Sequence, residues 1–148
     1  HEYGGAVAIH PFTSDPRKQW PAERFMELAR RITQETKSKV VLVGKTENWG
    51  QSPAGTVPNL IDLVNQTSLV ELAQVLKQCK LLISGDSGPM HLSAAVGTPV
   101  IALFRNDLAG KTARRWGPWG QGHAVIENND LAAITVEQVL AEARGRLK

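Results

Sequence analysis

The chain has 148 residues and a net charge of +3, with 17 Lys and Arg against 14 Asp and Glu. This length fits one globular domain with a real hydrophobic core, and no apolar run approaches the roughly 20 residues that a bilayer span needs. The mild positive charge favours an anionic ligand, but the chain lacks the long basic block typical of nucleic-acid binding. The lone Cys79 excludes an intramolecular disulfide and is expected to be a buried thiol.

The first half of the chain alternates between apolar runs and helical patterns. AVAI at 6–9 predicts a strand, and Pro21 then stands at a favoured first position of a helix. KVVLVG at 39–44 is typical of a parallel strand buried on both faces, and NLIDLV at 59–64 indicates a weaker strand. Ser68 begins a capping-box pattern, SLVE, which predicts the start of the next helix.

The second half repeats this alternation. Strands are expected at 80–84, 99–104 and 123–127, with a short helix over His91–Val96 and a last helix from near Thr135. Six strands separated by helices or long crossovers predict an α/β fold. We therefore expect a Rossmann-like three-layer domain with a mostly parallel six-stranded sheet.

The loop after the fourth expected strand reads GDSGPMH over 85–91. It is one glycine short of the GDSGGP run around the nucleophile of trypsin-like proteases, but those are all-β proteins, and Pro89 also breaks the nucleophile-elbow pattern. Two glycines instead let the backbone approach a ligand, and the helix that Pro89 opens directs free N–H groups and its positive dipole end at the same space. The pattern predicts an anion site, with a hydroxyl from Ser87 and a donor from His91.

Asp86 does not suit a phosphate, but it suits the neutral hydroxyls of a sugar. The alternative is that Asp86 and Ser87 only cap the helix, which is worth about 1 kcal/mol, and that His91 only packs. Other phosphate and metal signatures are absent. The GKT at 44–46 lacks the first glycine of a P-loop, no G-x-G-x-x-G opens a helix after the first strand, and there is no D-x-D, H-E-x-x-H or Cys/His cluster.

Three segments together resemble glycosyltransferase family 9, the lipopolysaccharide heptosyltransferases. They are DSGPMHLSAA at 86–95 with GTPVIALF at 97–104, KQWPAERFMELA at 18–29, and the looser RWGPWG at 115–120. The resemblance covers about residues 6 to 125. It implies a metal-independent, inverting transferase of GT-B architecture, in which two Rossmann-like domains face each other and the C-terminal one binds a nucleotide-sugar, typically ADP-heptose.

The resemblance implies donor contacts for eight residues: Thr13, Ser14, Lys18, Glu47, Asp86, Ser87, Gly88 and His91. By this resemblance Asp86 contacts the hydroxyls of the donor sugar and Glu47 those of the ribose. The others contact the diphosphate, and Lys18 and His91 stabilise it as it leaves. No catalytic base is identified in the chain. Two alternatives remain open: Lys18 is only a solvated surface charge, and Glu47 lies outside the site. Trp20 is expected to be a packing anchor.

Two departures from the family pattern leave the identity of the donor open. Arg105-Asn106-Asp107 stands where the family often has a Gly-Pro-Thr-like run, and Thr67 stands where a Met can face the base. The expectation that these loops form one binding site also has physical support that does not depend on the family. In the strand order 3-2-1-4-5-6, strands 1 and 4 meet at the topological switch point, where such sheets bind ligands. The 10–18 and 86–91 loops leave the carboxyl ends of those two strands and should converge there.

Residues 1–148 are therefore expected to form a single nucleotide-sugar-binding domain, a fragment of a longer two-domain chain. The full-length protein would be a cytoplasmic heptosyltransferase of lipopolysaccharide core biosynthesis, peripheral at the inner face of the inner membrane, and this fragment alone would be inactive. The missing N-terminal domain would hold most of the lipopolysaccharide core acceptor, and no cofactor, metal or nucleic acid is expected. The alternative is a non-catalytic nucleotide-binding module of the same fold. Nucleic-acid binding, a third possibility, rests on Lys111, Arg114 and Arg115 near two tryptophans.

Overall fold

The computed structural model describes residues 2–12, 19–47, 49, 52–85, 87–105 and 122–147. Six strands within them form one sheet, in which every neighbouring pair is parallel. The strands are β1 (Val7–His10), β2 (Val40–Leu42), β3 (Leu60–Asp62), β4 (Leu81–Gly85), β5 (Val100–Arg105) and β6 (Ala124–Asn128). Their order across the sheet is β3-β2-β1-β4-β5-β6, as expected from the sequence. The expected fold class, a Rossmann-like α/β domain with a six-stranded sheet, is confirmed.

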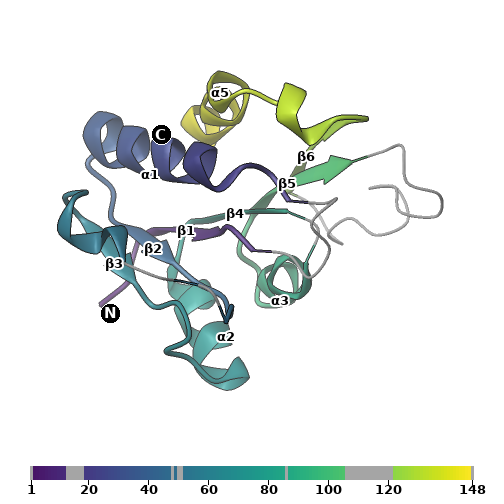
Figure 1. Cartoon of the computed structure of the whole chain (residues 1–148). Coiled ribbons are helices and arrows are strands. Elements are labelled where there is room, and N and C mark those ends of the chain that lie inside the picture. The colour runs from purple at the N-terminus through teal and green to yellow at the C-terminus, as the bar shows by residue number, and fades with distance from the viewer. Residues whose placement is uncertain are drawn as a thin grey trace.

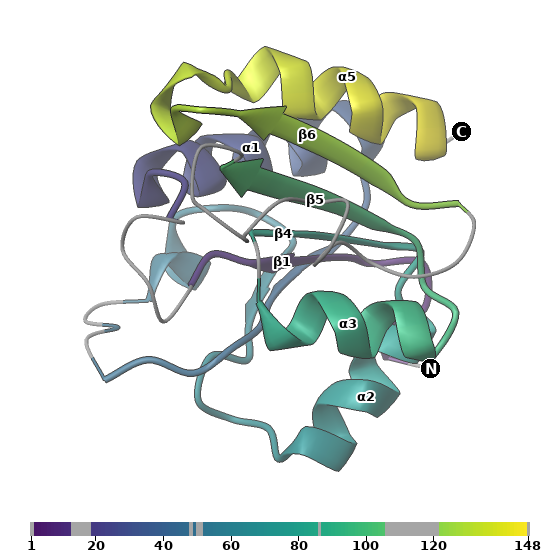
Figure 2. The same ribbon diagram turned by 90° about the vertical axis from the view of Figure 1, so that its right-hand side faces the viewer.

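Helices cover both faces of the sheet (Figure 1). α1 (Ala22–Thr36) and α5 (Val136–Arg146) lie on one face, and α2 (Leu69–Gln78) and α3 (Gly88–Ala95) lie on the other. Figure 2 shows the same layers in the turned view, with α5 above β6 and with α3 and α2 below β1 and β4. Two short 3-10 helices, η2 (Pro53–Gly55) and η3 (Leu131–Ala133), lie in the connections before β3 and before α5.

Successive residues of the central strand β1 face opposite layers. Val7 and Ile9 are buried in the cluster that includes Phe25 of α1, whereas Ala8 belongs to the cluster that includes Leu76 of α2. Side chains alternate along a strand, so a strand that is apolar at every position has to be covered on both faces. The continuous apolar runs of the sequence therefore require the three-layer arrangement.

The starts of α2 and α5 lie where the sequence indicates them. The Ser68 hydroxyl accepts from the backbone N–H of Glu71 at 3.1 Å, and the Glu71 carboxylate accepts from the Ser68 N–H at 2.9 Å. Thr135 and Gln138 form the same reciprocal pair at the start of α5. Each pair satisfies two N–H groups that the helix alone leaves without a partner.

Trp20 fixes the segment before α1 to the chain before α5. Its side chain is 1% exposed, its Nε1 donates to the carbonyl of Ile134 at 3.0 Å, and its ring packs edge-on against Phe25. The expected packing role of Trp20 is confirmed. Cys79 is also buried as expected, and desolvation raises the pKa of its thiol to about 12.

Candidate functional site

The candidate site lies where β1 and β4 end side by side. These two strands pair in register, so that His10 at the end of β1 is opposite Ser84 near the end of β4. β2 and β5 flank them, and the strand order reverses between β1 and β4. This is the switch point of the sheet, where neighbouring loops turn to opposite faces and leave a crevice for a ligand. The expected convergence is seen at His10 and Ser87, the described ends of the two loops.

A network of hydroxyls joins the two strand ends. The Ser87 Oγ lies 2.9 Å from the Ser84 Oγ and 3.2 Å from the His10 Nδ1. The Ser84 hydroxyl in turn donates to the Gly85 carbonyl at 2.8 Å. Ser87 is the N-cap residue of α3, yet its side chain makes no capping hydrogen bond. The Ser87 side chain therefore bonds to the strand ends rather than to the helix it begins, and its expected ligand contact stays a prediction.

His10 is a buried polar residue of this network that is not among the eight donor contacts expected from the sequence. Its side chain is 6% exposed, and desolvation lowers its pKa from 6.5 to about 4, because burial disfavours the charged imidazolium. The ring is therefore neutral at pH 7. The available signal was a histidine that ends an otherwise apolar strand at the expected switch point.

Gly44, just after β2, allows the His10 ring to lie where it does. The backbone of Gly44 has φ +122, and a Cβ there would lie 2.5 Å from the His10 Cδ2, 2.7 Å from the His10 Nε2 and 3.0 Å from the Phe12 Cδ2. Real Cβ atoms do not approach so closely, so this position needs glycine for its conformation and for its space. The GKT at 44–46 lacks the P-loop pattern, and nothing in the sequence pattern predicts this contact with His10.

Aromatic contacts tie the β2–β3 connection to the site. The Phe12 ring packs edge-on between His10, at a centroid distance of 5.9 Å, and Trp49, at 5.1 Å. The Trp49 Nε1 donates to the Asp62 carboxylate at 2.7 Å, next to the end of β3. This chain of contacts spans the carboxyl ends of β1, β2 and β3.

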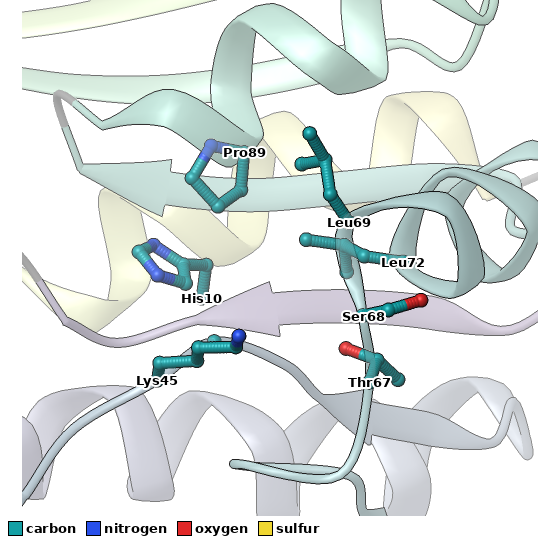
Figure 3. Close-up of a pocket in the computed structure, with 8 residues that line it drawn as sticks. His10, Lys45, Thr67, Ser68, Leu69, Leu72 and Pro89 are labelled. Atoms are coloured by element: carbon teal, nitrogen blue, oxygen red, sulfur yellow. The ribbon is translucent and has the colours of Figure 1, made fainter.

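A cavity of about 330 Å³ opens beside His10 (Figure 3). It is lined by residues from four segments: His10, Gly44, Lys45, Thr67, Ser68, Leu69, Leu72 and Pro89. The His10 ring lies between Pro89 and Lys45, and the two leucines approach from the start of α2 across the cavity. Apolar walls with a few polar groups are typical of small-ligand pockets of this size. The wall offers a cation from Lys45 and a hydroxyl from Thr67, whereas the Ser68 hydroxyl points away and caps α2.

The described residues include four of the eight expected donor contacts. Ser87 and Gly88 lie at the start of α3 beside His10, and a Cβ added to Gly88 would meet no atom of the described residues within 4 Å. His91 is partly buried in the first turn of α3, and Glu47 is exposed beyond Lys45. Their expected contacts stay predictions.

The other four expected contacts, Thr13, Ser14, Lys18 and Asp86, lie outside the described residues, as does 106–121 with the RWGPWG segment. Within the part of the chain that is described, no group of three or more His, Cys, Asp or Glu is placed to hold a metal ion. No helix in that same part has both the length and the apolar character to cross a membrane.

Sequence comparison places the chain among known proteins. The model of glycosyltransferase family 9 (heptosyltransferase) matches residues 3–143. The chain is 29% identical over 129 residues to lipooligosaccharide heptosyltransferase 2 of Campylobacter jejuni subsp. jejuni serotype O:2, and the match covers 82% of this chain and 38% of that protein. The chain thus spans less than half the length of this relative.

Solved structures share the fold. The glycosyl transferase family 9 protein from Veillonella parvula DSM 2008 has a TM-score of 0.85 at 24% identity, over 99% of this chain and 47% of that one. The E. coli heptosyltransferase WaaC with ADP has a TM-score of 0.80 at 22% identity, and the match covers 98% of this chain and 45% of that one. The iron-containing heptosyltransferase TibC, in complex with ADP-D-beta-D-heptose, is more distant, with a TM-score of 0.66 at 15% identity over 97% and 46%. At these identities the likeness shows the fold alone.

Proposed function

The chain belongs to glycosyltransferase family 9, and from this premise we propose that it is the donor-binding domain of a glycosyltransferase of lipopolysaccharide core biosynthesis. The donor would be a nucleotide-diphosphate sugar, with ADP-heptose as the first candidate. The observation that carries the proposal is the cavity of about 330 Å³ at the switch point, beside the start of α3. The proposed catalytic base and most of the acceptor site belong to the missing half of a two-domain enzyme.

The residues around the cavity suit the parts of such a donor. The apolar side chains of Leu69, Leu72 and Pro89 can cover the faces of a base, and Thr67 can hydrogen-bond its edge. The first N–H groups of α3 have no partner within the helix and favour an anion, so the diphosphate would lie there. Lys45 adds a positive charge at the cavity wall.

The proposed reaction is an inverting sugar transfer. The acceptor hydroxyl oxygen forms a bond to the anomeric carbon, the bond from that carbon to the diphosphate oxygen breaks, and the hydroxyl proton goes to a base. This chain would stabilise the departing diphosphate through Ser87, His91 and the α3 N–H groups, with Lys18 as a further cation. Asp86 would hold hydroxyls of the donor sugar and Glu47 those of the ribose.

We propose that donor binding needs no metal ion, because Lys18, His91 and the helix N-terminus can meet the charge of the diphosphate. The iron of TibC is a property of that protein, and 15% identity does not carry it to this chain. Because the acceptor is part of a lipid-linked core, the full-length protein is proposed to work in the cytoplasm at the inner face of the inner membrane.

Calorimetric titration tests the donor role. The 148-residue chain should bind ADP, should bind ADP-heptose more tightly, and should bind UDP and GDP more weakly than ADP. Adding EDTA should leave the affinity for ADP unchanged. Equal and negligible heats for all four nucleotides would contradict the proposal, and a tenfold or greater loss in EDTA would contradict metal independence.

An assay of sugar transfer to a deacylated lipopolysaccharide core tests whether catalysis needs the other domain of the proposed two-domain enzyme. The full-length product should catalyse transfer and the 148-residue chain should not. Binding of ADP-heptose without transfer by the full-length product would favour the non-catalytic module instead. Turnover by the chain alone at the full rate would place a base among its own residues and contradict the two-domain proposal.

A further inference from the structure

The hydroxyl network around His10 fixes the direction of each hydrogen bond. The Gly85 carbonyl can only accept, so the Ser84 proton points to it, over 2.8 Å. Ser84 then has no proton for the 2.9 Å contact with Ser87, and Ser87 must be the donor there. The remaining 3.2 Å contact, between the Ser87 Oγ and the His10 Nδ1, is a hydrogen bond only if Nδ1 carries a proton.

The surroundings of the other ring nitrogen agree with this assignment. In the described part of the chain, the hydrogen-bond contacts of the His10 ring use Nδ1, at 3.2 Å to Ser87 and 3.4 Å to Ser84. Nε2 instead lies beside Gly44, where an added Cβ would be 2.7 Å from it. A ring with pKa about 4 carries one proton at pH 7, so a proton on Nδ1 leaves Nε2 bare. An unprotonated Nε2 beside a Cα costs less free energy than a buried N–H that has no acceptor.

The choice of tautomer decides what Ser87 can offer a ligand. When His10 donates, Ser87 can turn its own proton from Ser84 to a ligand oxygen without breaking the bond from His10. With the opposite tautomer, Nδ1 would take the Ser87 proton, and the hydroxyl would present only lone pairs to an approaching anion. A phosphate oxygen would then be repelled where it should be bound.

We propose that His10 is a positioning residue that donates from Nδ1 to the Ser87 hydroxyl and so keeps the Ser87 proton available for an anionic oxygen of the ligand. This inference rests on the proposed function, because the anion it serves is the diphosphate of the donor. It adds a role for a residue that lines the cavity but that the family motifs around Asp86 and Lys18 do not contain.

The tautomer is measurable without any ligand. Long-range ¹H–¹⁵N spectra of the ¹⁵N-labelled chain at pH 7 distinguish the two nitrogens of each of its four histidines, and loss of one signal set in His10→Asn assigns His10. The expected pattern is a neutral ring with the proton on Nδ1. A proton on Nε2 would overturn the inference, whether or not ADP binds.

Variants then test the link to the ligand, with ADP as the probe. Asn at position 10 places an amide N–H near the place of Nδ1, whereas Leu fills the ring's space without a donor. His10→Leu and Ser87→Ala should each weaken ADP about threefold to tenfold, and His10→Asn should stay within about twofold of the wild-type chain. The double variant should be no weaker than either single one, because the two residues act as one unit.

Ser84→Ala is the matched control in the same network. It removes the resting partner of the Ser87 proton, so ADP should bind as well as before or slightly more tightly. Circular dichroism establishes that each variant is folded before its titration. The inference is wrong, and the ring only packs, if His10→Leu binds ADP as tightly as the wild-type chain. The same holds if folded His10→Asn loses as much affinity for ADP as His10→Leu. If the wild-type chain does not bind ADP, the proposed function fails, and the role of His10 toward an anion fails with it.

Discussion

The two faces of the sheet use their polar groups in different ways. On the α1–α5 face they join one element to another: Trp20 donates to the Ile134 carbonyl, and Arg144 of α5 pairs with Glu35 of α1 at 3.0 Å. Near the start of α2 and α3, polar groups instead line a cavity, and Leu69 is 71% exposed although the sheet is covered. The polar groups of the first face hold elements together, whereas those around the cavity are available to a ligand.

The largest effect is expected from breaking the first face. Trp20→Ala removes a fully buried indole and leaves the Ile134 carbonyl without this donor, so the free energy of unfolding should fall by about 3–5 kcal/mol. Urea unfolding measures the loss, and Trp20→Phe, which keeps most of the ring, should lose less. The affinity for ADP of the folded fraction should not change. An affinity that fell in parallel with stability would mean that the two faces are not separate.

Acid should weaken the second face through His10. Its pKa is about 4 when folded and 6.5 otherwise, so between these values the unfolded chain binds a proton that the folded chain does not. The free energy of unfolding should therefore fall as the pH drops from 6.5 toward 4, by on the order of 3 kcal/mol over the full range. Urea unfolding of the wild-type chain and of His10→Asn at several pH values isolates this contribution. Equal slopes for the two chains between pH 6.5 and 5 would contradict it.

Gly44→Ala should damage both stability and the site. The added Cβ would meet the His10 ring at 2.5 Å, and the crowding and the strained backbone together should cost about 1–3 kcal/mol. Gly97→Ala is the matched control, because Gly97 has φ +87 and open space around its Cβ position. Only Gly44→Ala should also weaken ADP, measured by titration. Equal behaviour of the two variants would show that backbone strain alone matters.

The smallest effect is expected from the two ion pairs of Glu35, one with Arg144 of α5 and one with Arg31 within α1. Glu35 accepts from Arg144 and Arg31, and these contacts lower the pKa of its carboxyl, with Arg144 as the larger cause. The pairs lie near the surface, where water and salt screen them. Arg144→Ala should lower the midpoint of thermal unfolding only slightly, and the difference from the wild-type chain should shrink in 1 M salt. A difference that grew with salt would contradict an ionic origin.

The same contrast explains how much the sequence could predict. Regular elements follow local rules, so the sequence was enough to predict the six strands, the strand order, the Ser68 cap and the packing role of Trp20. The importance of Gly44 and His10 could not be predicted, because it arises from a close approach between the end of β1 and the connection after β2, which are far apart in the sequence. Ser87 was found from its motif, but its bond to His10 could be seen only once β1 and β4 were placed side by side.

Mapping ADP onto the chain by NMR tests most directly whether the switch-point cavity is the donor site. Titration of ADP into the ¹⁵N-labelled chain should shift the backbone signals of Gly44, Lys45, 67–72 and 87–91. The signals of α1 and α5 on the opposite face should stay in place. Shifts confined to α1 and α5, or no shifts at millimolar ADP, would contradict the proposal that this cavity receives the nucleotide of the sugar donor.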